Sequence, residues 1–139
     1  MPSQAVLLAS LTIPGEAEYL HAAREFVART LGYGCAHSDT AVLLTSELVT
    51  NSVQHSRSRR PGGAVTITVI AVPGGIRVEV IGDGGPTVPA ASLSQPEPLD
   101  PGENGHGLRL VEILSARWSH YSDAAGTVTW FELTEPPCK

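Results

Sequence analysis

The sequence has few cysteines, few basic residues and no long apolar run, and each shortage excludes a class of protein. Two cysteines, Cys35 and Cys138, cannot build a disulfide framework or a four-ligand zinc site, so we interpret them as inert thiols. No stretch is long and apolar enough to span a bilayer. The amino terminus has no basic segment before its apolar residues, which argues against a secretory signal and predicts a cytoplasmic protein without membrane contact.

Basic residues are also scarce. The chain has 9 lysines and arginines against 14 aspartates and glutamates, which gives a formal net charge of −5. Proteins that bind nucleic acid directly generally present a basic patch to the phosphates, so this class is disfavoured. The one basic cluster comprises Arg57, Arg59 and Arg60, just beyond an expected helix. Arginine is favoured near a helix carboxyl terminus, and we interpret the cluster as a solvated helix end.

What remains is the composition of a globular protein, with 42% hydrophobic and 17% charged residues. A chain of 139 residues is large enough for one hydrophobic core and too small for two domains of typical size. We therefore expect residues 1–139 to form a single domain.

Hydrophobic periodicity predicts the order strand, two helices, hairpin, long loop, helix and hairpin. The expected ranges are strand 6–13, helices 16–31 and 38–58, hairpin 64–81, loop 82–105, helix 107–117, and strands near 117–121 and 127–133. Gly32 and Gly34 should close the first helix, and Ser38 or Asp39 should cap the second. Adjoining strands joined by turns predict an α+β fold, a two-layer sandwich whose mixed, mostly antiparallel sheet is covered on one face by helices. Residues 135–139 are expected to be a frayed tail.

The long helix carries a polar row beside its apolar side. The apolar side is predicted to contain Val42, Leu43, Leu48 and Val49. Glu47, Asn51 and His55 are spaced by four residues, so they stack along one face. A carboxylate, a carboxamide and an imidazole in line could hold a metal ion or move a proton. An ordinary solvated face is the alternative.

A carboxylate and glycines follow the expected hairpin directly. Asp83 could accept a hydrogen bond from an exocyclic amine such as that of adenine, and Gly85 would let a flat ring approach the backbone. The alternative is a simple turn, because aspartate and glycine both favour turns. The loop after it, 86–104, is long for a compact domain, which is typical of a functional lid or a disordered segment.

A second glycine segment, Gly105-His106-Gly107-Leu108, leads into the next helix. Free N–H groups at a helix start form an anion site, and glycine lets phosphate oxygens come close. Glycine at a helix entrance also occurs for packing reasons alone. Neither the P-loop nor the dinucleotide-binding glycine pattern is present.

Taken together, these motifs are much more specific. The sequence resembles the GHKL ATP-binding superfamily, with the Bergerat or histidine kinase-like ATPase fold, and within it the bacterial anti-sigma factor serine/threonine kinases. The segments that carry the resemblance are Ser46-Glu47-Leu48-Val49-Thr50-Asn51, the Asp83-x-Gly85 motif, and Gly105-His106-Gly107-Leu108-Arg109-Leu110-Val111-Glu112. The likeness extends over about residues 11–133.

The resemblance implies a role for each matching residue. Asn51 would coordinate Mg²⁺ bridging the ATP phosphates, and Glu47 would be the general base. Asp83 would recognise the adenine amino group beside Gly85. The phosphate-side segment would comprise Gly105, His106, Gly107 and Leu108, and residues 86–104 would be the ATP lid. His55 receives no assigned role.

Two functional hypotheses share this nucleotide pocket. The first is a Mg-ATP-dependent serine/threonine kinase that binds a sigma factor and phosphorylates an antagonist protein. The second is a nucleotide-binding interaction module without phosphotransfer. Glu47 favours the kinase, because nucleotide binding alone needs no base there. A structural domain with fortuitous motifs is a third reading, and a homodimer is compatible with each. The chain lacks the dimerisation and phospho-acceptor helices of a histidine kinase, which argues against that activity for this chain alone.

Overall fold

A computed structural model describes the backbone of residues 5–32, 36–55, 63–82, 105–123 and 126–134. Within these ranges the side chains of residues 36, 54, 55, 105–108, 122 and 123 are not described. The elements are β1 (Val6–Pro14), η1 (Ala17–Tyr19), α1 (Leu20–Leu31), α2 (Ala36–His55), β2 (Ala64–Val72), β3 (Gly75–Gly82), α3 (Gly105–Leu114), β4 (Arg117–Asp123) and β5 (Gly126–Leu133). The predicted order of elements is confirmed. In the described part of the chain, no helix is long and apolar enough to cross a membrane.

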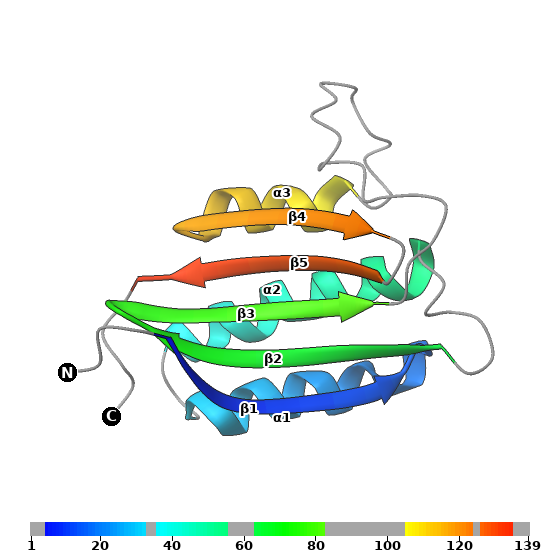
Figure 1. Ribbon diagram of the computed structural model, residues 1–139, viewed down its shortest axis with the longest axis horizontal. Helices are drawn as coiled ribbons and strands as arrows, with labels where there is room; N and C mark the ends of the chain where they lie inside the picture. The colour runs from blue at the N-terminus through cyan, green and yellow to red at the C-terminus, as the bar shows by residue number, and fades with distance from the viewer. Residues whose placement is uncertain (1–4, 33–35, 56–62, 83–104, 124–125, 135–139) are drawn as a thin grey trace.

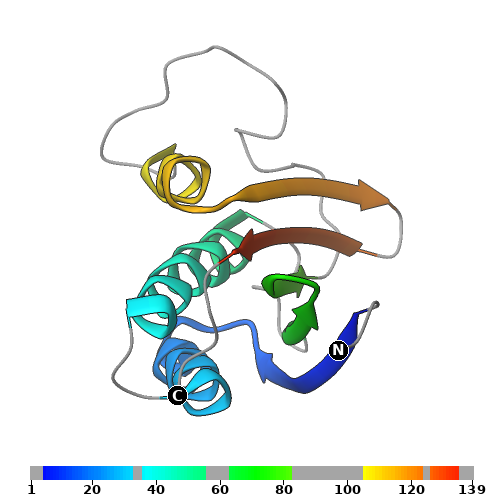
Figure 2. The same ribbon diagram turned by 90° about the vertical axis from the view of Figure 1, so that its left-hand side faces the viewer.

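The five strands form one sheet in the order β1-β2-β3-β5-β4, and each described pairing is antiparallel. The three α-helices cover one face of this sheet, with α1 behind β1 and β2, α2 behind β3, and α3 behind β4 (Figures 1 and 2). The predicted two-layer α+β fold is confirmed. The sheet is simpler than expected, since the described pairings include no parallel pair.

The β2–β3 hairpin turns through Pro73 and Gly74, as the sequence predicts. Gly74 has φ +83°, a conformation that favours glycine. At Gly75 the reason is space, because a Cβ atom there would overlap the carbonyl oxygen of Leu133 on β5. Glycine therefore allows β3 and β5 to pair up to the end of the hairpin.

The core lies between the helices and the sheet. Alternate residues of β2, β3 and β5 point into it, and Phe131, Ile67 and Leu44 are among its largest fully buried side chains. Two details of α2 differ from the prediction. Leu43 is 40% exposed, whereas the neighbouring Leu44 is fully buried. The helix begins at Ala36, so Ser38 lies inside its first turn rather than at the cap.

Helix boundaries also differ elsewhere. The segment predicted as one helix from residue 16 begins with the 3-10 turn η1 and becomes α-helical at Leu20. Gly32 closes α1 with φ +103°, as predicted, whereas Gly34 lies outside the described residues. α3 runs from Gly105 to Leu114 rather than from 107 to 117, because the sequence from Arg117 onwards joins β4.

The other face of the sheet carries an ion-pair cluster centred on Glu132. Arg77 Nε and Arg117 Nη2 donate to its two carboxylate oxygens at 2.9 and 2.7 Å. Arg77 also lies 3.9 Å above the ring centroid of Trp130. Burial on its own would raise the pKa of Glu132, but the hydrogen bonds and charges of Arg117 and Arg77 lower it overall.

Glu132→Gln is expected to lower the free energy of unfolding at neutral pH by about 1–3 kcal/mol, because charge-assisted hydrogen bonds are lost inside a covered cluster. A depressed folded-state pKa stabilises the fold above the unfolded-state pKa, and this contribution is lost as pH falls through the folded-state pKa. Urea titrations of both proteins at several pH values measure it. A difference that stays constant into strong acid would contradict the ionic origin. Glu79→Gln, in the same cluster but with a single 3.4 Å ion pair, is the milder control.

Candidate active site

The polar row predicted on the long helix lies on the side of α2 that faces away from α1. Val49 packs on the α1 side, and helical geometry places it about 200° around the axis from both Glu47 and Asn51. Leu48 is buried about 100° around the axis from Val49, and the sheet contacts α2 mainly through β3. Among the described elements, the remaining main neighbour of α2 is α3, so helical geometry puts Glu47 and Asn51 on the α3 side of the helix.

Asn51 is a buried polar residue, with 7% of its surface exposed. Its Nδ2 atom is buried and has no hydrogen-bond partner among the described residues. An unpaired buried donor costs about 1–3 kcal/mol, so native proteins rarely keep one without a partner or a function. Glu47, one turn earlier, is half-buried. At Glu47 and Asn51, the two members of the polar row with described side chains, the helix surface is therefore not an ordinary solvated face.

α2 is braced from the α1 side at the same level. Arg24 Nε donates to Ser46 Oγ at 3.2 Å, and Thr50 Oγ1 donates to the Ser46 carbonyl oxygen at 2.8 Å. Ser46 directly precedes Glu47 in the sequence. These bonds hold the helix turn that presents Glu47 and Asn51 toward α3.

Three chain segments reach the same end of the molecule as the carboxyl end of this row. β3 ends at Gly82, which pairs with Thr127 at the start of β5. The end of β3, the last turn of α2 and the first turn of α3 lie at the same end of the molecule (Figure 1). Gly82, the last described residue before Asp83 in the sequence, therefore lies at this end.

The glycine segment belongs to the helix itself. Because α3 begins at Gly105, the residues Gly105, His106, Gly107 and Leu108 form its first turn, not a loop before it. The first four N–H groups of an α-helix lack acceptors within the helix and carry the positive end of its dipole. This first turn can therefore donate hydrogen bonds to phosphate oxygens.

Residues 13–133 match the model of a protein family described as histidine kinase-like ATPase domain. The chain belongs to this family. Membership implies that it is an ATP-binding domain of a kinase-like family, typically working with Mg²⁺. A search of curated protein sequences found no match.

Solved structures with a similar fold include the blue-light activated histidine kinase of Erythrobacter litoralis EL346. Its TM-score is 0.54 at 25% identity, over 88% of this chain and 42% of the kinase. The histidine kinase domain of the same protein gives a TM-score of 0.56 at 24% identity, over 88% of this chain and 65% of that one. The ATPase domain thus spans less than half of the full kinase to which it is similar.

Several predicted site residues lie outside the described part of the structure. These are Asp83, Gly85 and the lid at 86–104, together with the side chains of His55, His106 and Leu108. The roles predicted for them remain predictions. Of the residues with described side chains, the structure brings Glu47 and Asn51 together on one side of α2 and places the backbone of the α3 first turn at the same end of the domain.

Buried hydroxyl groups on β5 were not predicted from the sequence. Thr127 and Thr129 point into the core layer from β5, each 7% exposed, and His120 Nδ1 lies 3.1 Å from Thr129 Oγ1. Burial lowers the pKa of His120, which favours its neutral form. The sequence pattern that could have revealed them is the two-residue alternation of a strand. It places both threonines on the same, core-facing side of β5 as Phe131.

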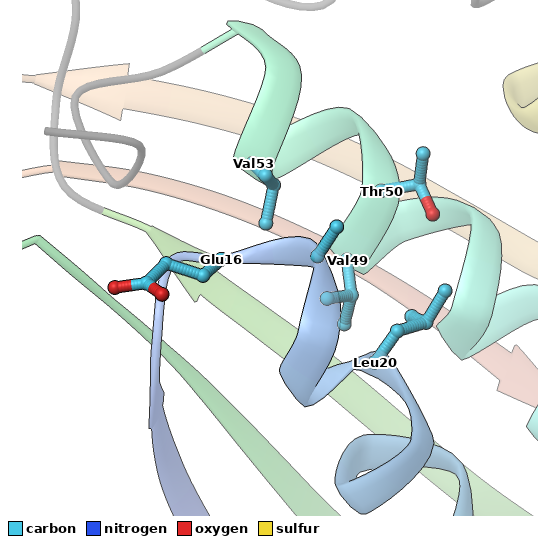
Figure 3. Close-up of a pocket in the computed structure, with 6 residues that line it drawn as sticks. Glu16, Leu20, Val49, Thr50 and Val53 are labelled. Atoms are coloured by element: carbon cyan, nitrogen blue, oxygen red, sulfur yellow. The ribbon is translucent and has the colours of Figure 1, made fainter.

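A small apolar pocket lies on the opposite side of α2. It has a volume of about 70 Å³, and Figure 3 shows Val49 and Val53 of α2 facing Leu20 of α1 across it. Glu47 and Asn51 do not line it. The pocket between α1 and α2 is therefore separate from the candidate active site.

Among the described residues, no group of three or more histidine, cysteine, aspartate or glutamate side chains is placed to hold a metal ion.

Proposed function

We propose that this ATPase domain binds Mg-ATP between α2 and α3 and transfers the γ-phosphate to a serine or threonine hydroxyl of a partner protein. By the resemblance noted above, the partners are a sigma factor and an antagonist protein, with the antagonist as phosphate acceptor, in the cytoplasm. The observation that carries the proposal is the pairing of Glu47 and Asn51 on the α3 side of α2, with the buried Asn51 Nδ2 unpaired among the described residues.

The donor set at this place fits a magnesium nucleotide. Mg²⁺ prefers oxygen ligands and commonly takes only one or two from the protein when phosphates supply others. The Asn51 side chain offers one such oxygen through its carboxamide. When bound, the ion would neutralise charge on the phosphate oxygens. The first turn of α3 would hold those oxygens through its free N–H groups.

Glu47 supplies the general base, a group that nucleotide binding alone does not require. Its carboxylate takes the proton of the acceptor hydroxyl as that oxygen bonds to the γ-phosphorus. The bond between the γ-phosphorus and the bridging oxygen breaks, and ADP is the leaving group. General-base assistance of this kind contributes about 10²–10⁴ in rate, with positioning and charge stabilisation supplying the rest.

A pull-down of binding partners from native cytoplasm, followed by incubation with γ-labelled ATP, tests the proposal. We expect label on serine or threonine of a captured protein. The second hypothesis, an interaction module without phosphotransfer, predicts capture without label, with captured proteins changing between ATP and ADP. It gains support from the high helix propensity of glutamate, which could retain Glu47 without a catalytic role. Nucleotide-independent capture without label would contradict both.

Asp83→Asn is expected to weaken ATP binding about tenfold or more while changing GTP binding little. A carboxylate accepts the adenine amino group in a charge-assisted hydrogen bond, and guanine has a carbonyl at that position. Titration calorimetry with ATP and GTP measures the ratio. Asp39→Asn changes an exposed carboxylate at the other end of α2 and is the matched control. An unchanged preference for ATP over GTP would remove Asp83 from the adenine site.

A further inference from the structure

A hydrogen bond between side chains joins α1 to α2 beside the candidate active site. Arg24 Nε donates to Ser46 Oγ at 3.2 Å. The two residues differ in exposure, because Arg24 is exposed on α1 whereas Ser46 is only 7% exposed. A buried serine hydroxyl needs a hydrogen-bond partner, and in a helix it often finds one in the carbonyl oxygen one turn earlier. Here the partner comes from another helix, so the bond ties α2 to α1.

The packing of α1 against α2 is incomplete next to this bond. The small apolar pocket described above lies about one turn further along α2, where Figure 3 shows Val49 and Val53 facing Leu20 across it. Side chains that line a cavity lose the contacts that would otherwise hold them in place. Arg24 follows Leu20 by one helical turn. Its hydrogen bond therefore contributes more of the restraint on α2 than it would beside a fully packed contact.

Ser46 is the neighbour of Glu47 in the sequence, so a restraint on one residue also acts on the other. Their side chains point about 100° apart around the α2 axis. The end of a side chain lies about 6 Å from the axis of an α-helix, and a rotation of the helix by about 10° moves it by about 1 Å. A displacement of about 1 Å in a reacting group can cost on the order of 10² in rate. Small rotations of α2 therefore matter for a base on this helix.

Glu47 depends on this restraint more than Asn51 does. Asn51 is 7% exposed, so the packing around it limits its movement. Glu47 is half-buried, and among the described residues no hydrogen bond or ion pair holds its carboxylate. Loss of the restraint should therefore disturb the proposed base while the proposed magnesium ligand stays in place.

We propose that Arg24 is a positioning residue for phosphate transfer. Its hydrogen bond to Ser46 fixes the rotation of α2 about its axis and thereby holds the Glu47 carboxylate at the acceptor hydroxyl. This inference rests on the proposed function, in which Glu47 is the general base. Arg24 acts through its Nε donor, so its positive charge is not required.

Two uncharged substitutions of Arg24 separate its hydrogen bond from its charge. In Arg24→Gln, the amide nitrogen is as many bonds from the backbone as Nε of arginine and can donate to Ser46 Oγ. In Arg24→Met, a methyl group takes that place and the donor is lost. We expect Arg24→Met to lower kcat for transfer from γ-labelled ATP to the captured partner about 10–100-fold, with KM for ATP changed less than about twofold. Arg24→Gln should keep most of the rate.

Ser46→Ala makes the same test from the other helix. It removes the acceptor of the bond and should reproduce the loss of kcat seen in Arg24→Met. The double variant should be no slower than either single variant, because both changes remove one and the same interaction. Arg29→Met is the matched control, since Arg29 also lies on α1 and its 3.4 Å ion pair is with Glu25 of the same helix. It should leave kcat unchanged.

The possible results distinguish this inference from the proposed function. Full kcat in Arg24→Met or in Ser46→Ala overturns the positioning role, while phosphate transfer by the unaltered chain still stands. Equal loss of rate in Arg24→Gln and Arg24→Met also overturns it, because the charge would then matter and not the bond. A purely structural contact predicts lower melting temperatures by circular dichroism with kcat unchanged. No transfer by the unaltered chain overturns both the positioning role and the proposed function.

Discussion

Asn51→Ala is expected to remove most of the stabilisation that Mg-ATP gives this domain. A ligand at 100 times its dissociation constant stabilises the folded state by about 2.7 kcal/mol, which raises Tm on the order of 10 °C for a domain of this size. The carboxamide of Asn51 is the protein ligand proposed for the bound magnesium ion. The measurement is a thermal scan with and without millimolar Mg-ATP, for the variant and the unaltered chain.

The same variant without nucleotide separates a ligand from a structural residue. Because Asn51 Nδ2 has no partner among the described residues, its removal relieves the cost of an unpaired buried donor and should not lower the nucleotide-free Tm. Thr45→Val is the matched control, since Thr45 Oγ1 is also buried and unpartnered among those residues but lies about 120° around the α2 axis from Asn51. It should leave the full Mg-ATP shift in place. An absent shift in the unaltered chain would refute the nucleotide site.

Glu47→Gln is expected to lower phosphate transfer about 10²–10⁴-fold while ATP affinity changes little. Glutamine keeps the size of the side chain and its helix propensity but cannot accept the proton of the acceptor hydroxyl. Initial rates of transfer from γ-labelled ATP to the captured partner give the effect, and calorimetry gives the affinity.

Glu112→Gln is the comparison for Glu47→Gln, because Glu112 is an exposed glutamate on the neighbouring helix α3. It should keep full transfer activity. Full activity in Glu47→Gln would exclude the base role and move the assignment of Glu47 to helix stability. Loss of ATP affinity together with activity would show that Glu47 acts through nucleotide binding.

The strands were predictable from the sequence because their environment is simple. In the β2–β3 hairpin, one face is buried and one is not, so Val65, Ile67, Val78 and Val80 alternate with polar residues and reveal the register. α2 is harder, since α1, the sheet and α3 surround it and its apolar residues spread around the axis. Sequence spacing alone could not show that Leu44, not Leu43, faces the core.

Of the candidate active site, only the residues that lie in sequence motifs could be predicted. Glu47 and Asn51 came from four-residue spacing and from the family resemblance, and the structure places both on the α3 side of α2. The burial of Asn51 Nδ2 could not be predicted, because it depends on how α2 packs. The burial of Thr127 was missed since a threonine in a strand usually reflects β propensity, and only the strand register places it opposite Gly82 at the end of β3.

β5 lies between β3 and β4 in the sheet, although the connection formed by residues 83–104 and the helix α3 separate β3 from both strands in the sequence. Seven residue pairs from Ile76 with Leu133 to Gly82 with Thr127 fasten β5 to β3, while β4 packs on α3. The spacing of β3 and β5 is therefore fixed by this ladder and not by the length of the connection 83–104. Lengthening that connection twofold would cost only about 0.6 kcal/mol in chain entropy. The length of this connection can therefore change at little cost in free energy while the spacing of the strands stays the same.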